Sequence, residues 1–472
     1  MAKLLFLGAS VSQLPAIRYA RTLGHEVVAC DGDPHAVAFP FCDVRETVDF
    51  SDVESVVAVG RRERVDGVLA ISTDRAVVPA AVASARLGLP GIGIDVARAM
   101  THKPAMRRRL AEAGVPQPQH TTLTAADDPS RLSGIRLPGV LKPADSGGQR
   151  GLFLVERPHD LAERLPEALA ASRTGEAIFE EYVDGSELNT LFAVRDGAPA
   201  LLTVSDRLRP DGVGFGVGWI HRFPSQLPDE VLAEAVAVAS HAIEALGLRD
   251  GIAFPQVLAS TRGVFVVEVA ARIAAGQMAD LVRHATGIEV YDIAFAQALG
   301  EQVPDEMVTP KHTRPVAIRF LTASPGLLPV GTVTSIAGLD DVRRAPGVLD
   351  AGLYFDVGAH ITPLQVDADR RGYVIATAAD ASGALALAEA AARRLRVETG
   401  GPPPPVVARR RFRRHPSRPR LVAAAACLAA VAALAAAVIA SDGTRSPVRH
   451  LRPGVKLAHH ARHTSSAHAV GA

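Results

Sequence analysis

Apolar and polar positions alternate with two different periods along the first hundred residues of the chain. Short apolar runs predict buried strands at 3–8, 25–30 and 66–71. Segments with helical periodicity lie between and after them, at 14–23 and 75–87. Strands that alternate with helices are typical of a parallel sheet whose two faces are both covered. We therefore expect residues 1–100 to form an α/β domain with a parallel sheet.

From about residue 101 the pattern changes, and predicted strands outnumber predicted helices. A helix begins near Lys103 and is closed by Gly114 and Pro116. Strands are then predicted at 137–142, 151–155, 177–183, 188–194, 199–205, 251–258 and 263–270, and helices at 228–246 and from about 276. A strand that returns after a short loop pairs with the strand before it in antiparallel fashion. Residues 101–300 are therefore expected to form a second domain.

A smaller α+β unit is predicted at 310–398. Its strands are expected near 315–321, 331–337, 351–356 and 372–377, with a final helix at 383–396. The globular pattern then stops, because residues 400–420 are rich in proline and arginine, as a linker is.

Residues 421–440 form a run of twenty residues without a polar or charged side chain. A helix of this length spans about 30 Å, which matches the hydrocarbon core of a bilayer. Twelve of the twenty are alanine, so a helix packed on a partner or facing solvent is the alternative. Seven arginines at 409–420 precede the run and favour the cytoplasmic side. We expect a single-pass membrane protein whose folded part is cytoplasmic, with a disordered tail at 441–472.

Composition excludes some classes of partner. Lys+Arg 51 and Asp+Glu 50 almost cancel, so nucleic acid is not expected as a partner. The three cysteines are too scattered for a disulfide framework or a zinc site, which fits a reducing compartment. The first residues, "MAKLLFLGASVSQLP", contain an apolar run too short for a signal peptide and are expected to begin with a buried strand.

One glycine-rich stretch, "VLKPADSGGQRG" at 140–151, has the character of an anion site. Glycines allow backbone N–H groups to approach a ligand, and Lys142 adds a positive charge. The Walker A motif is excluded because the lysine precedes the glycines. A bound dinucleotide is not favoured either, since Gly8 begins the turn "GASVSQLP" without the G-x-G-x-x-G pattern, although Asp31 is suitably spaced. The alternative is an ordinary hairpin turn with a surface lysine.

Five elements occur in a fixed order along the chain: Lys103, Lys142 with its glycine loop, "FEEYVDGSE" at 179–187, Gln256 and "EVAAR" at 268–272. This ordered set resembles the ATP-grasp superfamily over roughly residues 1–300. Residues 310–398 resemble the C-terminal domain of ATP-grasp L-amino acid ligases. The resemblance implies a Rossmann-like N-terminal domain, a central domain of two antiparallel-sheet subdomains that hold ATP, and a small C-terminal α+β domain.

The resemblance also implies roles for individual residues. Lys103 and Lys142 would contact the phosphates, under a flap made of Ser146, Gly147, Gly148 and Gly151. Glu180, Glu181 and Val183 would follow the adenine edge, and Glu187 would bind the ribose hydroxyls. An adenine needs one backbone donor and one backbone acceptor, which a strand end can offer. The alternative for 179–187 is an acidic strand end that faces water.

Magnesium, or manganese in its place, is implied together with ATP. Glu268 and Gln256 would be the metal ligands, although the family usually has glutamate at the position of Gln256. The family pattern Glu-x-Asn-x-Arg reads here as Glu268 to Arg272 with alanine at Ala270, which cannot ligate a metal. Arg272 would stabilise the charge of the transferred phosphoryl group.

The sequence thus predicts an ATP-dependent, ADP-forming ligase. A carboxylate would be activated as an acyl phosphate and attacked by an amine, with amino acids or dipeptide-like molecules as substrates. One alternative is an ATP-grasp carboxylase or a ligase of nucleotide precursors. Another is a non-catalytic ATP-binding module tethered to the membrane. A homodimer is kept as an alternative to a monomer, and the sequence does not name either substrate.

Overall fold

The computed structural model of the chain describes residues 1–127, 136–210 and 215–400. All of these belong to one structural unit. In these ranges no helix is both long enough and apolar enough to span a bilayer. The predicted span at 421–440 lies outside the described residues, as do the linker after Gly400 and the tail at 441–472.

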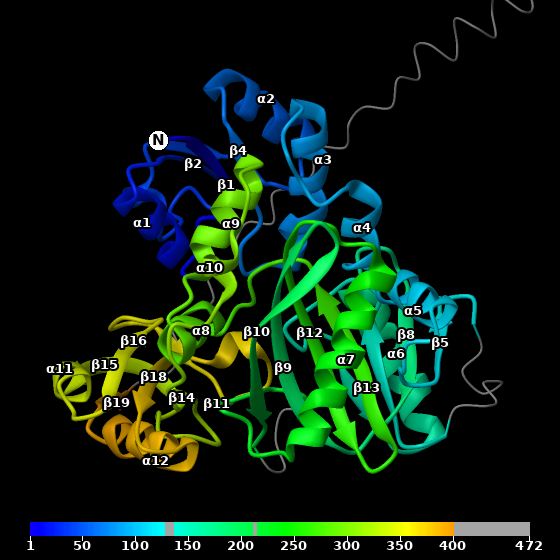
Figure 1. Cartoon of the computed structure of the whole chain (residues 1–472). Helices are drawn as coiled ribbons and strands as arrows, with labels where there is room; N and C mark the ends of the chain where they lie inside the picture. Colours follow the sequence, from blue (N-terminus) through cyan, green and yellow to red (C-terminus); the bar gives the residue numbers. More distant parts are fainter. Residues whose placement is uncertain (128–135, 211–214, 401–472) are drawn as a thin grey trace, which may run out of the picture. The chain divides into compact units, whose positions relative to one another are not determined.

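The N-terminal region contains a parallel sheet, as the sequence predicts, and its strand order is β3-β2-β1-β4. Its strands are β1 (Lys3–Leu7), β2 (Glu26–Asp31), β3 (Val44–Thr47) and β4 (Gly67–Leu69). The accompanying helices are α1 (Leu14–Thr22), α2 (Val53–Glu63), α3 (Val77–Leu87) and α4 (Ile94–Ala99), with short 3-10 turns η1 (Phe39–Phe41) and η2 (Asp74–Ala76). This region is blue in Figure 1. Strand β3 and helix α2 were not predicted.

An antiparallel sheet follows, with strand order β5-β8-β6-β7. It consists of β5 (His120–Leu123), β6 (Gly139–Pro143), β7 (Phe153–Val155) and β8 (Ala177–Glu181). The pairing of Gly139 with Val155 confirms that the glycine-rich loop joins two antiparallel strands. Helix α5 (Lys103–Glu112) precedes the sheet, and α6 (Pro158–Ala171) buries Leu161 and Leu165 against it.

The largest sheet has the strand order β13-β12-β9-β10-β11-β14-β18-β16 and is antiparallel throughout. Its first part comprises β9 (Ser186–Arg195), β10 (Ala198–Leu208), β11 (Ile220–Phe223), β12 (Gly251–Ser260) and β13 (Gly263–Ala270). Helix α7 (Asp229–Leu246) packs on this part through a row of small and apolar side chains that includes Ala239 and Ile243. Helices α8 (Met278–Thr286), α9 (Val290–Leu299) and α10 (Asp305–Val308) follow in the chain.

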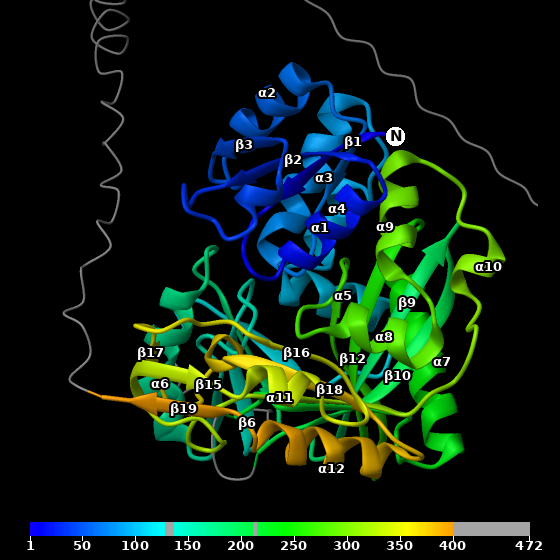
Figure 2. The same cartoon turned by 90° about the vertical axis from the view of Figure 1, so that its left-hand side faces the viewer.

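The C-terminal region continues this sheet. Strand β14 (Val316–Phe320) pairs with β11, and β18 (Gly372–Thr377) and β16 (Val348–Leu353) complete the edge. The remaining strands β15 (Gly331–Ala337), β17 (His360–Ile361) and β19 (Arg396–Thr399) form a second, smaller sheet, with α11 (Leu339–Arg343), η4 (Asp367–Asp369) and α12 (Ala381–Ala392). Figure 2 shows these elements in yellow and orange, with α12 along their lower side. Periodicity predicted β14, β15, β16 and β18 but not β17 or β19, and it could not reveal that β14, β16 and β18 join the central sheet.

Candidate functional site

A pocket lies between the antiparallel sheet of β6 and β8 and the end of the large sheet at β12 and β13. Most residues that the sequence singled out line this one pocket. They are Lys103, Lys142, Ser146, Gly147, Gly148, Glu180, Glu181, Val183, Glu187, Gln256 and Glu268. Gly151 is not among them. A Cβ atom there would meet Ala171 at 2.8 Å and Pro143 at 2.9 Å, and its φ is +68°, so this glycine is needed for packing and for the turn.

Two basic side chains hold the carboxylate of Glu180 inside the pocket wall. Lys142 Nζ lies 2.7 Å from Glu180 Oε2, and Arg107 Nε lies 2.8 Å from Oε1. Burial alone would raise the pKa of Glu180, but Arg107 and Lys142 lower it to about 2. Burial lowers the pKa of Lys142, and Glu180 opposes that effect. Lys142 is therefore a member of a buried ion cluster at the edge of the predicted phosphate site.

Arg107 was missed by the sequence analysis. Besides its pair with Glu180, it donates hydrogen bonds of 2.8 Å to the carbonyl groups of Val266 and Val267 on β13. It therefore ties both antiparallel sheets to helix α5. Its only signal in the sequence is the run "RRR" at 107–109, which does not distinguish the buried arginine from the exposed Arg108.

Lys103 connects the helix start to the glycine loop. Its backbone N–H donates to Ala144 O over 2.8 Å, and its Nζ donates to Ser146 O over 2.8 Å. Its Nζ also lies 4.0 Å from Glu268 Oε1. A buried ammonium between a glycine-rich backbone and a carboxylate is well placed for an anion that also binds a metal ion.

The end of strand β8 offers backbone groups to a planar base. Glu181 N–H donates to Gln119 O and Tyr182 N–H donates to Pro138 O. Over the described ranges, the next amide, that of Val183, has no protein acceptor, although the side chain is only 4% exposed. Val183 therefore presents a donor where the sequence predicted the adenine edge.

Glu187 is already engaged by an arginine. Both of its carboxylate oxygens lie 2.8 Å from Arg207 Nη1, which also donates to Gly216 O. Burial would lower the pKa of Arg207, but Glu187 and Asp367 raise it, so the guanidinium stays charged. If Glu187 binds ribose as predicted, its carboxylate would have to contact both Arg207 and the ribose hydroxyls.

Gln256 and Glu268 are directly opposite each other on β12 and β13. Gln256 Nε2 donates to Asn189 Oδ1 over 3.3 Å, which leaves its carbonyl oxygen for a cation. Ala270 is 3% exposed, and in the part of the chain with described side chains no group of three or more His, Cys, Asp or Glu could hold a metal. Two oxygen donors fit Mg²⁺, which keeps several waters and takes further ligands from phosphates.

Arg272 lies beside this pocket in an adjoining polar cavity. Its Nε and Nη2 lie 2.8 and 3.0 Å from the two carboxylate oxygens of Asp74, a residue of η2 in the N-terminal region. Burial would raise the pKa of Asp74, but Arg272 lowers it. A Cβ at Gly147 would lie 2.9 Å from Asp74 Oδ2, so the glycine loop passes directly over this ion pair. The sequence analysis missed Asp74, although polar residues after a parallel strand are common in active sites.

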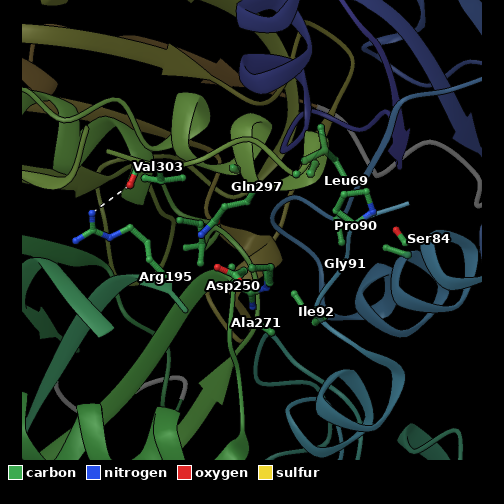
Figure 3. Close-up of a pocket in the computed structure, with 18 of the residues that line it drawn as sticks. Leu69, Ser84, Pro90, Gly91, Ile92, Arg195, Asp250, Ala271, Gln297 and Val303 are labelled. Atoms are coloured by element: carbon green, nitrogen blue, oxygen red, sulfur yellow. Dashed lines mark hydrogen bonds between the residues drawn. The ribbon is translucent and has the colours of Figure 1, made fainter. Parts of the chain in front are cut away.

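A separate cavity of about 860 Å³ is shown in Figure 3. Apolar residues such as Leu69, Pro90 and Ile92 line it, and Arg195 Nη1 donates to Val303 O at its rim over 3.1 Å. Of the residues predicted for ATP, metal and catalysis, Arg272 alone reaches it in the described structure. The other residues predicted for ATP and metal therefore lie away from this cavity, most of them at the pocket between β6, β8, β12 and β13.

Two family models match the chain. The carbamoyl-phosphate synthase L chain ATP-binding domain matches residues 102–306, and the L-amino acid ligase C-terminal domain 2 matches residues 320–400. The fold is similar to the crystal structure of an L-amino acid ligase from Bacillus licheniformis, with a TM-score of 0.72 and 20% identity. That likeness covers 85% of this chain and 99% of the other.

Two curated proteins are similar in sequence. The uncharacterized protein y4rH of Sinorhizobium fredii is 29% identical over 63% of this chain, and the chain covers 60% of its length. A D-alanine–D-alanine ligase of Desulforudis audaxviator is 30% identical over 42% of this chain and is covered over 72% of its own length. The fold and the sequence relatives agree on one superfamily. The chain belongs to the ATP-grasp superfamily.

Proposed function

We propose that the protein is an ATP-dependent ligase that joins a carboxylate to an amine. A carboxylate oxygen attacks the γ-phosphorus of ATP, ADP leaves, and the acyl phosphate is then attacked by an amine with release of phosphate. The observation that carries this proposal is the direct connection between two cavities. The pocket between β6, β8, β12 and β13, which we call the nucleotide pocket, shares four residues with the cavity that contains Arg272 and Arg207. They are Gly147, Gly148, Gln256 and Glu268.

The position of each residue in the site fits one role in this reaction. Lys103 and the backbone of the glycine loop hold the phosphates and keep water out when the loop closes. Glu268 and Gln256 would hold Mg²⁺, which neutralises phosphate charge when bound. Arg272, oriented by Asp74, stabilises the negative charge that passes from the phosphate to the acyl phosphate. The protein supplies orientation and electrostatic stabilisation rather than a covalent intermediate.

Amino acids or dipeptide-like molecules are the proposed substrates. The match at residues 320–400 to an L-amino acid ligase domain supports them. A carboxylase and a ligase of nucleotide precursors belong to the same superfamily and are the competing activities. A non-catalytic ATP-binding module is favoured only by Ala270.

A phosphate-release screen separates these activities. Purified protein with Mg-ATP is supplied with pairs of amino acids, with bicarbonate, and with aminated sugar phosphates. Phosphate release that requires a carboxylate and an amine together supports the proposal. Release with bicarbonate alone would identify a carboxylase, and tight binding of Mg-ATP without release in any mixture would identify a module without catalysis.

We also propose that residues 421–440 anchor the chain in a membrane with the folded region in the cytoplasm. The uninterrupted apolar run and the arginines before it support this, and the need for cytoplasmic ATP agrees with it. The test compares membrane fractionation of the full chain with that of a truncation ending at Gly400. An anchored full chain should sediment with membranes and resist high salt, whereas the truncation should not. Equal recovery of both in the supernatant would refute the anchor.

A further inference from the structure

Three cavities are connected in series, beginning at the nucleotide pocket. The middle cavity, of about 90 Å³, contains residues of the glycine loop and of the metal pair. It continues into an outer chamber of about 290 Å³. The middle cavity and the outer chamber share Ala274, Ala275, Met278, Asp367 and Arg370. A molecule bound at the predicted phosphoryl acceptor position can therefore extend into the outer chamber.

The middle cavity is suited to a carboxylate. Arg207, Arg272 and Arg370 all line it. His221 is buried there, and burial together with Arg370 and Arg207 keeps its pKa well below the ordinary value, so its ring is neutral and accepts a hydrogen bond from Asn189 over 3.0 Å. Guanidinium groups bind carboxylates with favourable geometry. The reacting carboxylate would thus lie between these arginines and the phosphates.

One acceptor at the junction of the two cavities accepts no hydrogen bond from the described residues. Asp367 Oδ1 is buried, and among the described residues it makes no hydrogen bond, with Arg207 Nη2 the facing cation at 3.7 Å. The other oxygen, Oδ2, lies 3.3 Å from Arg370 Nη2. A buried oxygen without a donor is costly, and a ligand that brings N–H groups would remove that cost.

The outer chamber has apolar walls and paired charges. Met278, Phe320, Tyr291 and Tyr354 line it, and Arg370 lies over the Phe320 ring at 4.4 Å. The charged groups at its edge are in ion pairs, although Arg371 Nε is buried without a hydrogen-bond partner among the described residues. Asp280 lies 2.8 Å from Arg283, and Arg371 lies 3.8 Å from Asp369. Such a chamber accepts a large uncharged side chain and penalises a charged one, because a charged group would lose its water beside carboxylate and guanidinium groups that are already in ion pairs.

Backbone geometry gives an independent sign that these cavities are functional. Across the described ranges, six residues other than glycine have positive φ, and three of them line the connected cavities. These are Gln149 (φ 60°), Ser72 (φ 56°) and Gln277 (φ 59°). Residues held in this sparsely populated region concentrate at binding and catalytic sites.

We propose that the acyl donor is an α-amino acid with a large, uncharged side chain, an inference that rests on the ligase activity proposed above. Its carboxylate occupies the middle cavity, its ammonium group donates to Asp367 Oδ1, and its side chain fills the outer chamber. Because Asp367 keeps the ammonium group protonated, its nitrogen has no free electron pair and cannot attack. This substrate therefore reacts through its carboxylate and becomes the N-terminal part of the product.

The two steps balance without any further reactant. A carboxylate oxygen forms a bond to the γ-phosphorus as the bond to the ADP oxygen breaks. The neutral amine of the second substrate then forms the C–N bond, the C–O bond to phosphate breaks, and the amine proton passes to phosphate or water.

Binding to the full chain tests the inference separately from catalysis. Calorimetric titrations, with a non-hydrolysable ATP analogue and Mg²⁺ present, compare L-phenylalanine, L-alanine, L-glutamate and 3-phenylpropanoate. L-phenylalanine should bind about 10–100-fold more tightly than L-alanine, because several methylene equivalents are buried. It should also bind at least about 10-fold more tightly than 3-phenylpropanoate, which lacks the ammonium group. Equal affinities across the set, or a preference for L-glutamate, would overturn the inference.

Two variants test which residues cause the preference. Each variant is assessed by the ratio of its affinities for two ligands, because partial unfolding lowers both affinities alike and leaves the ratio unchanged. Met278→Trp fills the outer chamber and should reduce the phenylalanine-to-alanine ratio about 10-fold. The same change at Met307, which lies outside the chamber, should leave the ratio unchanged. Asp367→Asn should reduce the phenylalanine-to-phenylpropanoate ratio about 10-fold. Unchanged ratios in Met278→Trp and Asp367→Asn would overturn the assignment.

Different outcomes would refute the chamber assignment and the ligase activity. A binding preference as described, without phosphate release from any pair, would support the chamber and refute the ligase activity. Phosphate release from amino acid pairs without any preference among side chains would support the ligase and refute the chamber.

Discussion

The nucleotide pocket and the outer chamber lie in one series of cavities but are built differently. The nucleotide pocket takes its polar groups from the start of α5, from strands of the two sheets and from one glycine-rich loop, and each group lies in a short stretch of sequence that can be recognised. The outer chamber combines the loop at Ser12 and residues within 274–280 and 367–371 with single residues such as Ser72 and Tyr354. Chemistry that is local in sequence can be predicted from a motif, whereas a specificity chamber assembled from distant segments cannot.

The largest expected effect concerns the rigidity of the nucleotide pocket. Arg107→Ala leaves the carboxylate of Glu180 buried with one partner fewer and frees two carbonyl groups of β13. The free energy of unfolding should fall by about 3–5 kcal/mol, as for other buried ion pairs that lose one member. Urea unfolding measures it, with the exposed neighbour Arg108→Ala as the matched control. A loss at Arg107 no greater than at Arg108 would show that the pocket wall does not depend on this cluster.

A pH series tests the same ion cluster around Glu180. The pKa of Glu180 is about 2 in the folded chain, below its ordinary value of 4.5, so the ion cluster contributes stability that is complete above about pH 5. That contribution, about 3 kcal/mol, should be lost as the pH falls toward about 2. The gap in unfolding free energy between wild type and Glu180→Gln should therefore narrow between pH 6 and about pH 3. A gap that stays constant would contradict the depressed pKa.

A smaller effect is expected in the middle cavity, which connects the nucleotide pocket with the outer chamber. Asp74→Asn weakens the bidentate hold on Arg272 without removing the arginine. The rate constant kcat should fall about 10–100-fold, because a misplaced charge stabilises the transition state less well. Affinity for Mg-ATP should stay within about threefold of the wild type, and the exposed Asp95→Asn serves as control. A change confined to nucleotide affinity would show that Asp74 supports the pocket instead of positioning Arg272.

Sequence analysis predicted the α/β domain and the antiparallel strands around the glycine loop, and nearly all the residues that it assigned to ATP and metal line the nucleotide pocket. It succeeded there because strand periodicity and the ordered motif are local. It missed Arg107, Asp74 and Asp367. Their ion-pair partners, which are Glu180, Arg272 and Arg207, lie 73, 198 and about 160 positions away in the chain. It also did not predict β11, so it could not show that β14 pairs with this strand.

The glycine loop illustrates the limit in detail. Three of its glycines were grouped as one flap, yet Gly147 faces Asp74, Gly148 faces Asp367, and Gly151 packs against Ala171 and Pro143. Spacing alone cannot separate glycines that approach a ligand from a glycine that approaches a helix. The difference becomes visible only when α6 and η4 are in place.

The central claim is that ATP activates a carboxylate as an acyl phosphate, and oxygen transfer tests it most directly. The amino acid pair that supports turnover is supplied with ¹⁸O in the carboxylate of the acyl donor, and the released phosphate is analysed by mass spectrometry. The account predicts one ¹⁸O atom in each phosphate released, because the attacking carboxylate oxygen leaves with phosphorus. Phosphate without ¹⁸O, formed while the product accumulates, would contradict it.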